Sequence, residues 1–131
     1  MVLLNNFPSQ VLSILQHFVT RCGYSHLRLD GKTSEERRVK IVQQFNADPH
    51  TFVLLASTRA GGVGLNLTGA NVVVIFDPNW NPAHDAQAQD RAYRLGQGRD
   101  VSVYRLVTSA SIEESMYLRQ VYKQVSVCAI L

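Results

Sequence analysis

The sequence has few of the residues that would indicate a disulfide scaffold, a metal cluster or a membrane protein. Its 131 residues include only two cysteines, Cys22 and Cys128, which lie far apart and lack metal-ligand spacing. We therefore expect reduced thiols in a reducing compartment. No apolar run reaches the ~18 residues of a membrane span, and the N-terminus lacks the charged-then-apolar order of a signal peptide. These absences predict a soluble intracellular protein with no membrane partner.

Charged residues are also scarce, at 18% of the chain, whereas hydrophobic residues make up 46%. This composition is sufficient for one packed core, and the length predicts a single domain. The net charge of +3 permits contact with nucleic acid without demanding it. The four histidines share no cluster, so no metal ligands are predicted.

Short apolar runs alternate along the chain with segments of helical period. The pattern predicts strands at 2–4, 25–30, 51–56, 71–76 and 101–107, with helices at 9–22, from 34 onward, at 82–95 and at 112–124. Continuous apolar runs are typical of strands covered on both faces. The order of the elements predicts an α/β fold with a central, mostly parallel sheet flanked by helices on both faces.

Within these segments, Val39, Val42 and Phe45 form the expected buried stripe of the second helix. Ser111 is the expected cap of the last helix, and Pro82 is expected to start the third. Residues 125–131 form an apolar tail, for which an edge strand and a foreign chain end are the two interpretations.

Two glycine-containing segments resemble nucleotide motifs but fail on spacing. Asp30-Gly31-Lys32-Thr33 lacks the upstream glycine of a Walker loop, because that position is His26. We therefore expect a turn with a helix cap there. The pair Gly62 and Gly64 lacks the third glycine of a dinucleotide fingerprint, where the bulky Leu67 stands.

Two other loops are candidates for ligand contact. The segment 57–67 places three glycines and two hydroxyls after a strand, which suits either a phosphate contact or a tight turn. The loop 77–82 holds the chain's only tryptophan, Trp80, between two prolines. A tryptophan held in this way either stacks against a nucleotide or packs over a helix end.

The most informative pair is Arg91 and Arg94. Three residues apart on a predicted helix, they are expected to share one face. A guanidinium carries a fork of donors that matches phosphate oxygens, and two forks together suit the charge on a phosphoryl group in transfer. Because no phosphate-binding loop accompanies them, the pair is interpreted as half of a site that another module completes.

Five motifs in order carry a family resemblance. They are Leu29-Asp30-Gly31-x-Thr33, Arg38 with Phe45-Asn46, the Ser-Thr-Arg-Ala-Gly-Gly segment 57–62, Asp77-Pro-Asn-Trp-Asn-Pro, and Asp90-Arg-Ala-x-Arg-x-Gly-Gln. Residues 2 to about 124 resemble the C-terminal RecA-like lobe of Swi/Snf-type ATPases of helicase superfamily 2. The segment 118–124 is most similar to the Cockayne-syndrome-B-like, or Rad26-like, excision-repair branch. We therefore expect a helicase C-terminal domain over 1–124, followed by the tail at 125–131.

The resemblance implies half of a nuclear, DNA-dependent ATPase that translocates on double-stranded DNA and acts on nucleosomes or stalled RNA polymerase. ATP with magnesium would lie between this lobe and an N-terminal RecA-like lobe that supplies the Walker loop and the metal ligands, so this chain alone should be inactive. Arg91 and Arg94 would be arginine fingers supported by Gln87, and the nucleotide-side residues would be Gly61, Gly62, Gly64 and Asp90. The implied DNA contacts are Ser57, Thr58, Arg59, Trp80, Asn81, Lys32 and Arg38.

The sequence departs from the family pattern at three places, one of which is the apolar tail 125–131 where the family usually continues with polar residues. Asn5, Asn6 and Phe7 stand where Phe-Ser-Gln is usual, and Lys32 replaces a common serine. Two alternative functions remain, an RNA-directed superfamily 2 lobe and a catalytically inactive α/β interaction module.

Overall fold

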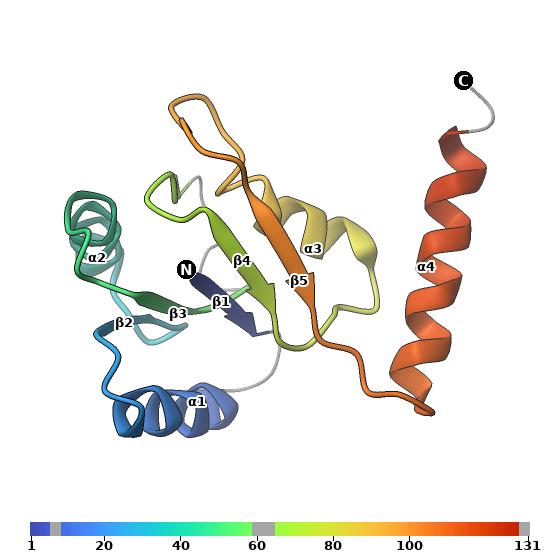
Figure 1. Cartoon of the computed structure of the whole chain (residues 1–131), viewed down its shortest axis with the longest axis horizontal. Helices are drawn as coiled ribbons and strands as arrows, with labels where there is room; N and C mark the ends of the chain where they lie inside the picture. The colour runs from blue at the N-terminus through green and yellow to red at the C-terminus, as the bar shows by residue number, and fades with distance from the viewer. Residues whose placement is uncertain (6–8, 59–64, 129–131) are drawn as a thin grey trace.

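The computed structural model describes residues 1–5, 9–58 and 65–128. These residues form five strands and four helices in the predicted order (Figure 1). The strands are β1 (Val2–Asn5), β2 (His26–Leu29), β3 (Val53–Ser57), β4 (Val72–Ile75) and β5 (Ser102–Arg105). The helices are α1 (Ser9–Arg21), α2 (Glu35–Ala47), α3 (Pro82–Gln89) and α4 (Ile112–Cys128).

The strands make one parallel sheet in the order β2-β3-β1-β4-β5. Leu3 at the centre of β1 pairs with Leu55 of β3 on one side and Val74 of β4 on the other. The predicted α/β fold with a parallel sheet is therefore confirmed. The order reverses at β1, which places the connections on both faces of the sheet.

Alternate residues of the central strands build two cores. Leu3 and Leu55 point to the face covered by α1, where Leu12 and Val19 are buried. Their neighbours Leu4 and Leu54 point to the opposite face, where they pack with Val42 and Phe45 of α2. The period of two in a strand thus explains why these runs are apolar throughout. Val39, the third residue predicted for the α2 stripe, is instead 50% exposed.

The starts of α3 and α4 follow their sequence signals. The Asn81 side chain accepts a hydrogen bond from the Ala83 N–H at 3.1 Å, and Pro82 stands at the first helical position. The Ser111 hydroxyl accepts from the Glu113 N–H at 3.1 Å. Helix α4 continues through Cys128, so the edge-strand prediction is wrong for 125–128. Positions 129–131 lie outside the described residues.

The predicted helix 82–95 is too long at its end, because α3 stops at Gln89. Residues 90–97 form successive turns, with the Ala92 N–H bonded to the Gln89 carbonyl and the Gln97 N–H to the Arg94 carbonyl. Tertiary contacts outweigh helical propensity here, since Ala92 is 1% exposed and is drawn into the core. The arginine pair therefore does not lie on a helix.

Candidate functional site

The parallel sheet separates the predicted site residues into two groups. Each strand ends at the same edge of the sheet, and α3 runs back to the opposite edge (Figure 1). The predicted DNA contacts among the described residues follow strand ends or begin the next helix: Lys32, Arg38, Ser57, Thr58, Trp80 and Asn81. Arg91 and Arg94 follow the end of α3 and lie at the opposite edge, beside the segment that enters β4. Arg59, Gly61, Gly62 and Gly64 lie outside the described residues.

The Asp30 turn confirms the turn predicted for Gly-Lys-Thr, whereas the predicted helix cap does not form, because Ser34 at the N-cap of α2 makes no side-chain capping hydrogen bond. The Asp30 carboxylate accepts hydrogen bonds from the Lys32 N–H at 3.0 Å and the Thr33 hydroxyl at 3.2 Å, and it pairs with Arg28 at 3.0 Å. Burial alone would raise the pKa of Asp30, but the bonds from Lys32 and Arg28 outweigh it and lower the pKa. The turn leaves the Lys32 side chain exposed. Arg38 is tied to the same turn through the Thr33 carbonyl at 2.8 Å.

Trp80 is held on a fixed loop and is 71% exposed. The Asn79 N–H donates to both carboxylate oxygens of the buried Asp85, at 2.9 and 3.2 Å. The Asn81 N–H donates to the Asn79 side chain, and Gln120 of α4 donates to the Asn79 carbonyl at 2.6 Å. This degree of exposure leaves most of the indole accessible to a ligand, while Gln120 ties its loop to α4. The loop displays the indole at the carboxyl edge of the sheet.

Asp77 lies at the base of the same loop. Burial, followed by the charges of Glu113 and Asp85, raises the pKa of Asp77 from 3.8 to about 6. Across the described residues no group of three or more His, Cys, Asp or Glu is arranged to hold a metal ion. None of the helices formed by those residues is long and apolar enough to cross a membrane.

The two arginines occupy different environments. Arg91 is 8% exposed, whereas Arg94 is exposed. Burial, and then the charge of Arg94, lowers the pKa of Arg91. No ion pair joins the Arg91 guanidinium to an acid in the part of the chain that the structure describes. The prediction of a shared helical face is wrong, although Arg91 is close enough to Arg94 for the charge of Arg94 to contribute to its lowered pKa.

An open pocket of about 770 Å³ lies on this arginine turn. Its lining includes Tyr93, Arg94, Gln97, Arg99 and Asp100. The other predicted nucleotide-side residues, Gln87 and Asp90, are exposed at the end of α3 nearby. Arg94 and Arg99 give the pocket two cationic side chains beside the carboxylate of Asp100, Arg91 is not among its lining residues, and no other element of the described chain closes it. This geometry suits a site that a second module completes.

The sequence prediction did not assign a role to the residue that fixes this turn, Gln97. Its amide nitrogen donates to the carbonyls of Ala70 at 2.8 Å, Thr68 at 3.1 Å and Ala92 at 3.2 Å. The Leu67 N–H donates to the Arg91 carbonyl at 2.9 Å. These bonds join the arginine turn to the segment that enters β4. The only sequence feature that could have indicated this role is the position of Gln97 directly after Gly96, at the end of the arginine motif.

A second group supports that segment from α2. The Asn46 side chain donates to the Asn66 carbonyl and accepts from the Gly69 N–H, both at 2.8 Å. A Cβ on Gly69 would lie 2.9 Å from the Asn46 Cα, so only glycine fits this approach. Through these contacts the end of α2, the turn before β4 and the arginine turn form one unit.

Comparison with known proteins identifies the family to which this chain belongs. The profile of the helicase conserved C-terminal domain matches residues 4–96. The chain belongs to this family. It is 53% identical over 99% of its length to the mouse DNA excision repair protein ERCC-6-like 2, and 56% identical over 94% to Switch 2 of Arabidopsis thaliana. It spans only 8% and 14% of those two proteins, respectively.

The similarity extends to human DNA excision repair protein ERCC-6, at 49% identity over 94% of this chain and 8% of the relative. Among solved structures, the C-terminal part of the Fun30 ATPase domain superposes with a TM-score of 0.85 and 41% identity, over 89% of this chain and 37% of that one. The RecA-like lobe and the relation to Swi/Snf-type and Cockayne-syndrome-B-like proteins are thereby confirmed.

Proposed function

We propose that this chain is the second RecA-like lobe of an ATP-dependent translocase on double-stranded DNA, of the excision-repair type. The observation that carries the proposal is the arginine turn, where a largely buried Arg91, which has no acidic partner among the described residues, stands beside the exposed Arg94. A buried cation without a counter-ion costs stability, so its retention favours an external anion as its partner. A nucleotide phosphate is the anion that the family resemblance supplies.

The chain's own residues fit one side of a triphosphate and not its metal. The open pocket on the arginine turn offers guanidinium donors, whereas the described residues have no cluster of acids arranged to hold magnesium. ATP with magnesium would supply the phosphoryl group to be transferred, held by an N-terminal lobe. Arg91 and Arg94 would then stabilise charge on that group once the lobes close. The isolated chain is accordingly expected to be inactive.

The carboxyl edge would carry the contacts to DNA. Trp80 is exposed on a fixed loop, Lys32 is exposed on the Asp30 turn, and Ser57 ends β3 at the same edge. Lysine, hydroxyl and indole groups at one edge suit the phosphates and the minor groove of a duplex. Because the arginine turn and this edge lie at opposite ends of α3, lobe closure on a nucleotide would move the DNA contacts relative to the other lobe. The relatives' names, which include excision repair and chromatin remodeling, support a role in DNA repair or chromatin remodelling, and the family resemblance implies that the role is nuclear, on nucleosomes or stalled polymerase.

The test uses the two-lobe protein that contains this chain and measures steady-state ATP hydrolysis with duplex DNA and with RNA of equal length. Arg94→Ala should lower turnover by roughly 10³–10⁵-fold, the effect of an arginine finger. Arg37→Ala, which removes an exposed arginine of α2, should leave turnover unchanged. Unchanged turnover in Arg94→Ala would support the inactive interaction module instead. Stimulation by RNA and not by duplex DNA would support the RNA-directed lobe.

A further inference from the structure

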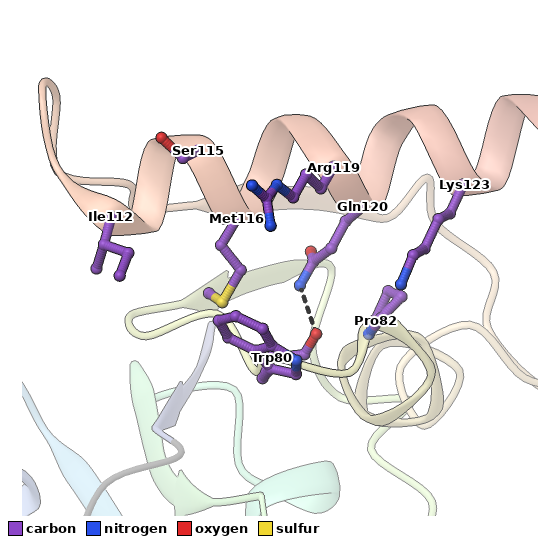
Figure 2. A pocket seen from close by; sticks show the side chains of 8 residues that line it. All are labelled: Trp80, Pro82, Ile112, Ser115, Met116, Arg119, Gln120 and Lys123. Atoms are coloured by element: carbon purple, nitrogen blue, oxygen red, sulfur yellow. Dashed lines mark hydrogen bonds between the residues drawn. The ribbon is translucent and has the colours of Figure 1, made fainter.

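A pocket of about 230 Å³ lies between α4 and the Trp80 loop (Figure 2). Trp80 and Pro82 line it from the loop, and Met116, Arg119 and Lys123 line it from α4. Figure 2 shows Met116 pointing toward the indole of Trp80 and Lys123 pointing toward Pro82. No motif of the sequence analysis includes the α4 side of this pocket as a site.

The two sides of the pocket are joined rigidly. Gln120, only 6% exposed, donates from its amide nitrogen to the Asn79 carbonyl at 2.6 Å and the Trp80 carbonyl at 3.2 Å. Both carbonyls belong to the loop that displays the indole. The part of α4 that carries Arg119 and Lys123 is therefore held beside the Trp80 loop.

The charge of the pocket has one sign. Its eight lining residues include two cations, Arg119 and Lys123, and no acid. The two lie one helical turn apart on the same face, and both are exposed. Neither forms an ion pair with any residue that the structure describes. The acid of the adjacent helix start, Glu113, is engaged by the Thr108 N–H at 2.9 Å.

An exposed indole beside two unpaired cations matches the chemistry of a sugar-phosphate backbone, in which anionic phosphates alternate with apolar sugar surface. The pocket also adjoins Trp80, so it continues the edge assigned above to DNA. We propose that Arg119 and Lys123 bind phosphates of duplex DNA and extend the interface from the Trp80 loop onto α4. This inference rests on the proposed function, which already assigns duplex DNA to that edge.

The experiment measures binding of the full chain to a fluorescent DNA duplex by anisotropy over a series of salt concentrations. The test variant is Arg119→Gln with Lys123→Gln. The control variant, Arg37→Gln with Lys40→Gln, makes the same charge change at exposed positions of α2. Loss of two phosphate contacts should reduce the slope of log K against log salt by about 1.8, or about 0.9 per contact. The control should keep the wild-type slope, and thermal unfolding should verify that both variants fold.

Two further arms separate this inference from the proposed function. Trp80→Ala tests the assigned edge alone, and a glutamate-rich peptide tests an acidic protein segment as the occupant. If the wild-type chain binds no duplex, both proposals are overturned. If Trp80→Ala weakens binding while the α4 variant keeps the control's slope, only the α4 inference is overturned. Loss of peptide binding without a change of the DNA slope would overturn it in favour of a protein partner.

Discussion

Replacing Gln97 by alanine removes the side chain that holds the arginine turn. The Gln97 amide nitrogen has two N–H donors, which three carbonyls share at 2.8–3.2 Å, and its oxygen accepts from the Arg99 N–H at 3.1 Å. The carbonyls belong to both segments that meet there, the turn before β4 and the turn after α3. The substitution therefore breaks a junction between two segments and not a local bond.

The size of the effect follows from the number of bonds. Counting the two N–H donors and the one bond that the oxygen accepts, at about 1 kcal/mol each, gives a total of about 3 kcal/mol. Gln97 is only half-buried, so water can reach part of the vacated site and reduce the loss. We expect Gln97→Ala to lower the free energy of unfolding by about 2 kcal/mol. For a domain of this length that corresponds to a melting temperature roughly 6–10 °C lower.

Thermal unfolding followed by circular dichroism measures this shift. Gln43→Ala is the matched control, because Gln43 is exposed in the middle of α2 and alanine favours a helix. Gln97→Glu serves as an isosteric variant, since its carboxylate presents an acceptor to carbonyls that need a donor, and it should be at least as unstable as Gln97→Ala. If Gln97→Ala melts within about 2 °C of Gln43→Ala, the assignment of Gln97 as the junction is refuted.

Three other substitutions test neighbouring features. Gly69→Ala places a Cβ 2.9 Å from the Asn46 Cα and should lower the free energy of unfolding, measured by chemical denaturation, by about 1–3 kcal/mol. In the control Gly31→Ala the added Cβ has nothing within 4 Å, so the unfolding free energy should not change. Equal denaturation midpoints for the two variants would contradict the packing argument. Arg91→Met removes a buried cation that has no acidic partner among the described residues. We therefore expect an unchanged or higher melting temperature, together with loss of ATP hydrolysis by the two-lobe protein. A lower melting temperature would indicate a structural role for Arg91. Asp77, with its pKa raised from 3.8 to about 6, holds its proton more tightly in the folded state, so it lowers stability as pH rises through that window. Asp77→Asn should therefore raise the melting temperature relative to the wild-type chain more at about pH 7.5 than at about pH 4, and an equal effect at both pH values would argue against the raised pKa.

The element order could be predicted because its signals are local. Apolar runs such as 53–56 and caps such as Asn81 and Ser111 depend on nearest neighbours along the chain. The end of α3 could not be predicted in this way. Residues 90–95 suit a helix, but burial of Ala92 and the bonds from Gln97 favour turns.

In the candidate site, too, some features could be predicted from local sequence and others could not. Motif order was sufficient to predict the family and to single out Trp80 and the arginine pair, because those residue types and spacings are specific. It could not predict that Arg91 is buried while Arg94 is exposed, since that difference depends on where the chain turns after Gln89. Nor could it find the α4 pocket, because its α4 residues lie roughly 30–40 positions from Trp80 along the chain and are brought beside it by the fold, with Gln120 hydrogen-bonded to the Trp80 carbonyl.

The amino-acid sequence by itself determined the α/β class, the mostly parallel sheet and the family, because hydrophobic period and motif spacing act over short stretches of chain. The tertiary structure decided which groups share an environment. It placed the arginine turn and the tryptophan loop at opposite edges of one sheet, and it brought α4 to the side of Trp80. These placements depend on packing and hydrogen bonds between residues far apart in the chain, such as Gln97 with Ala70 and Gln120 with Asn79, which no local pattern encodes.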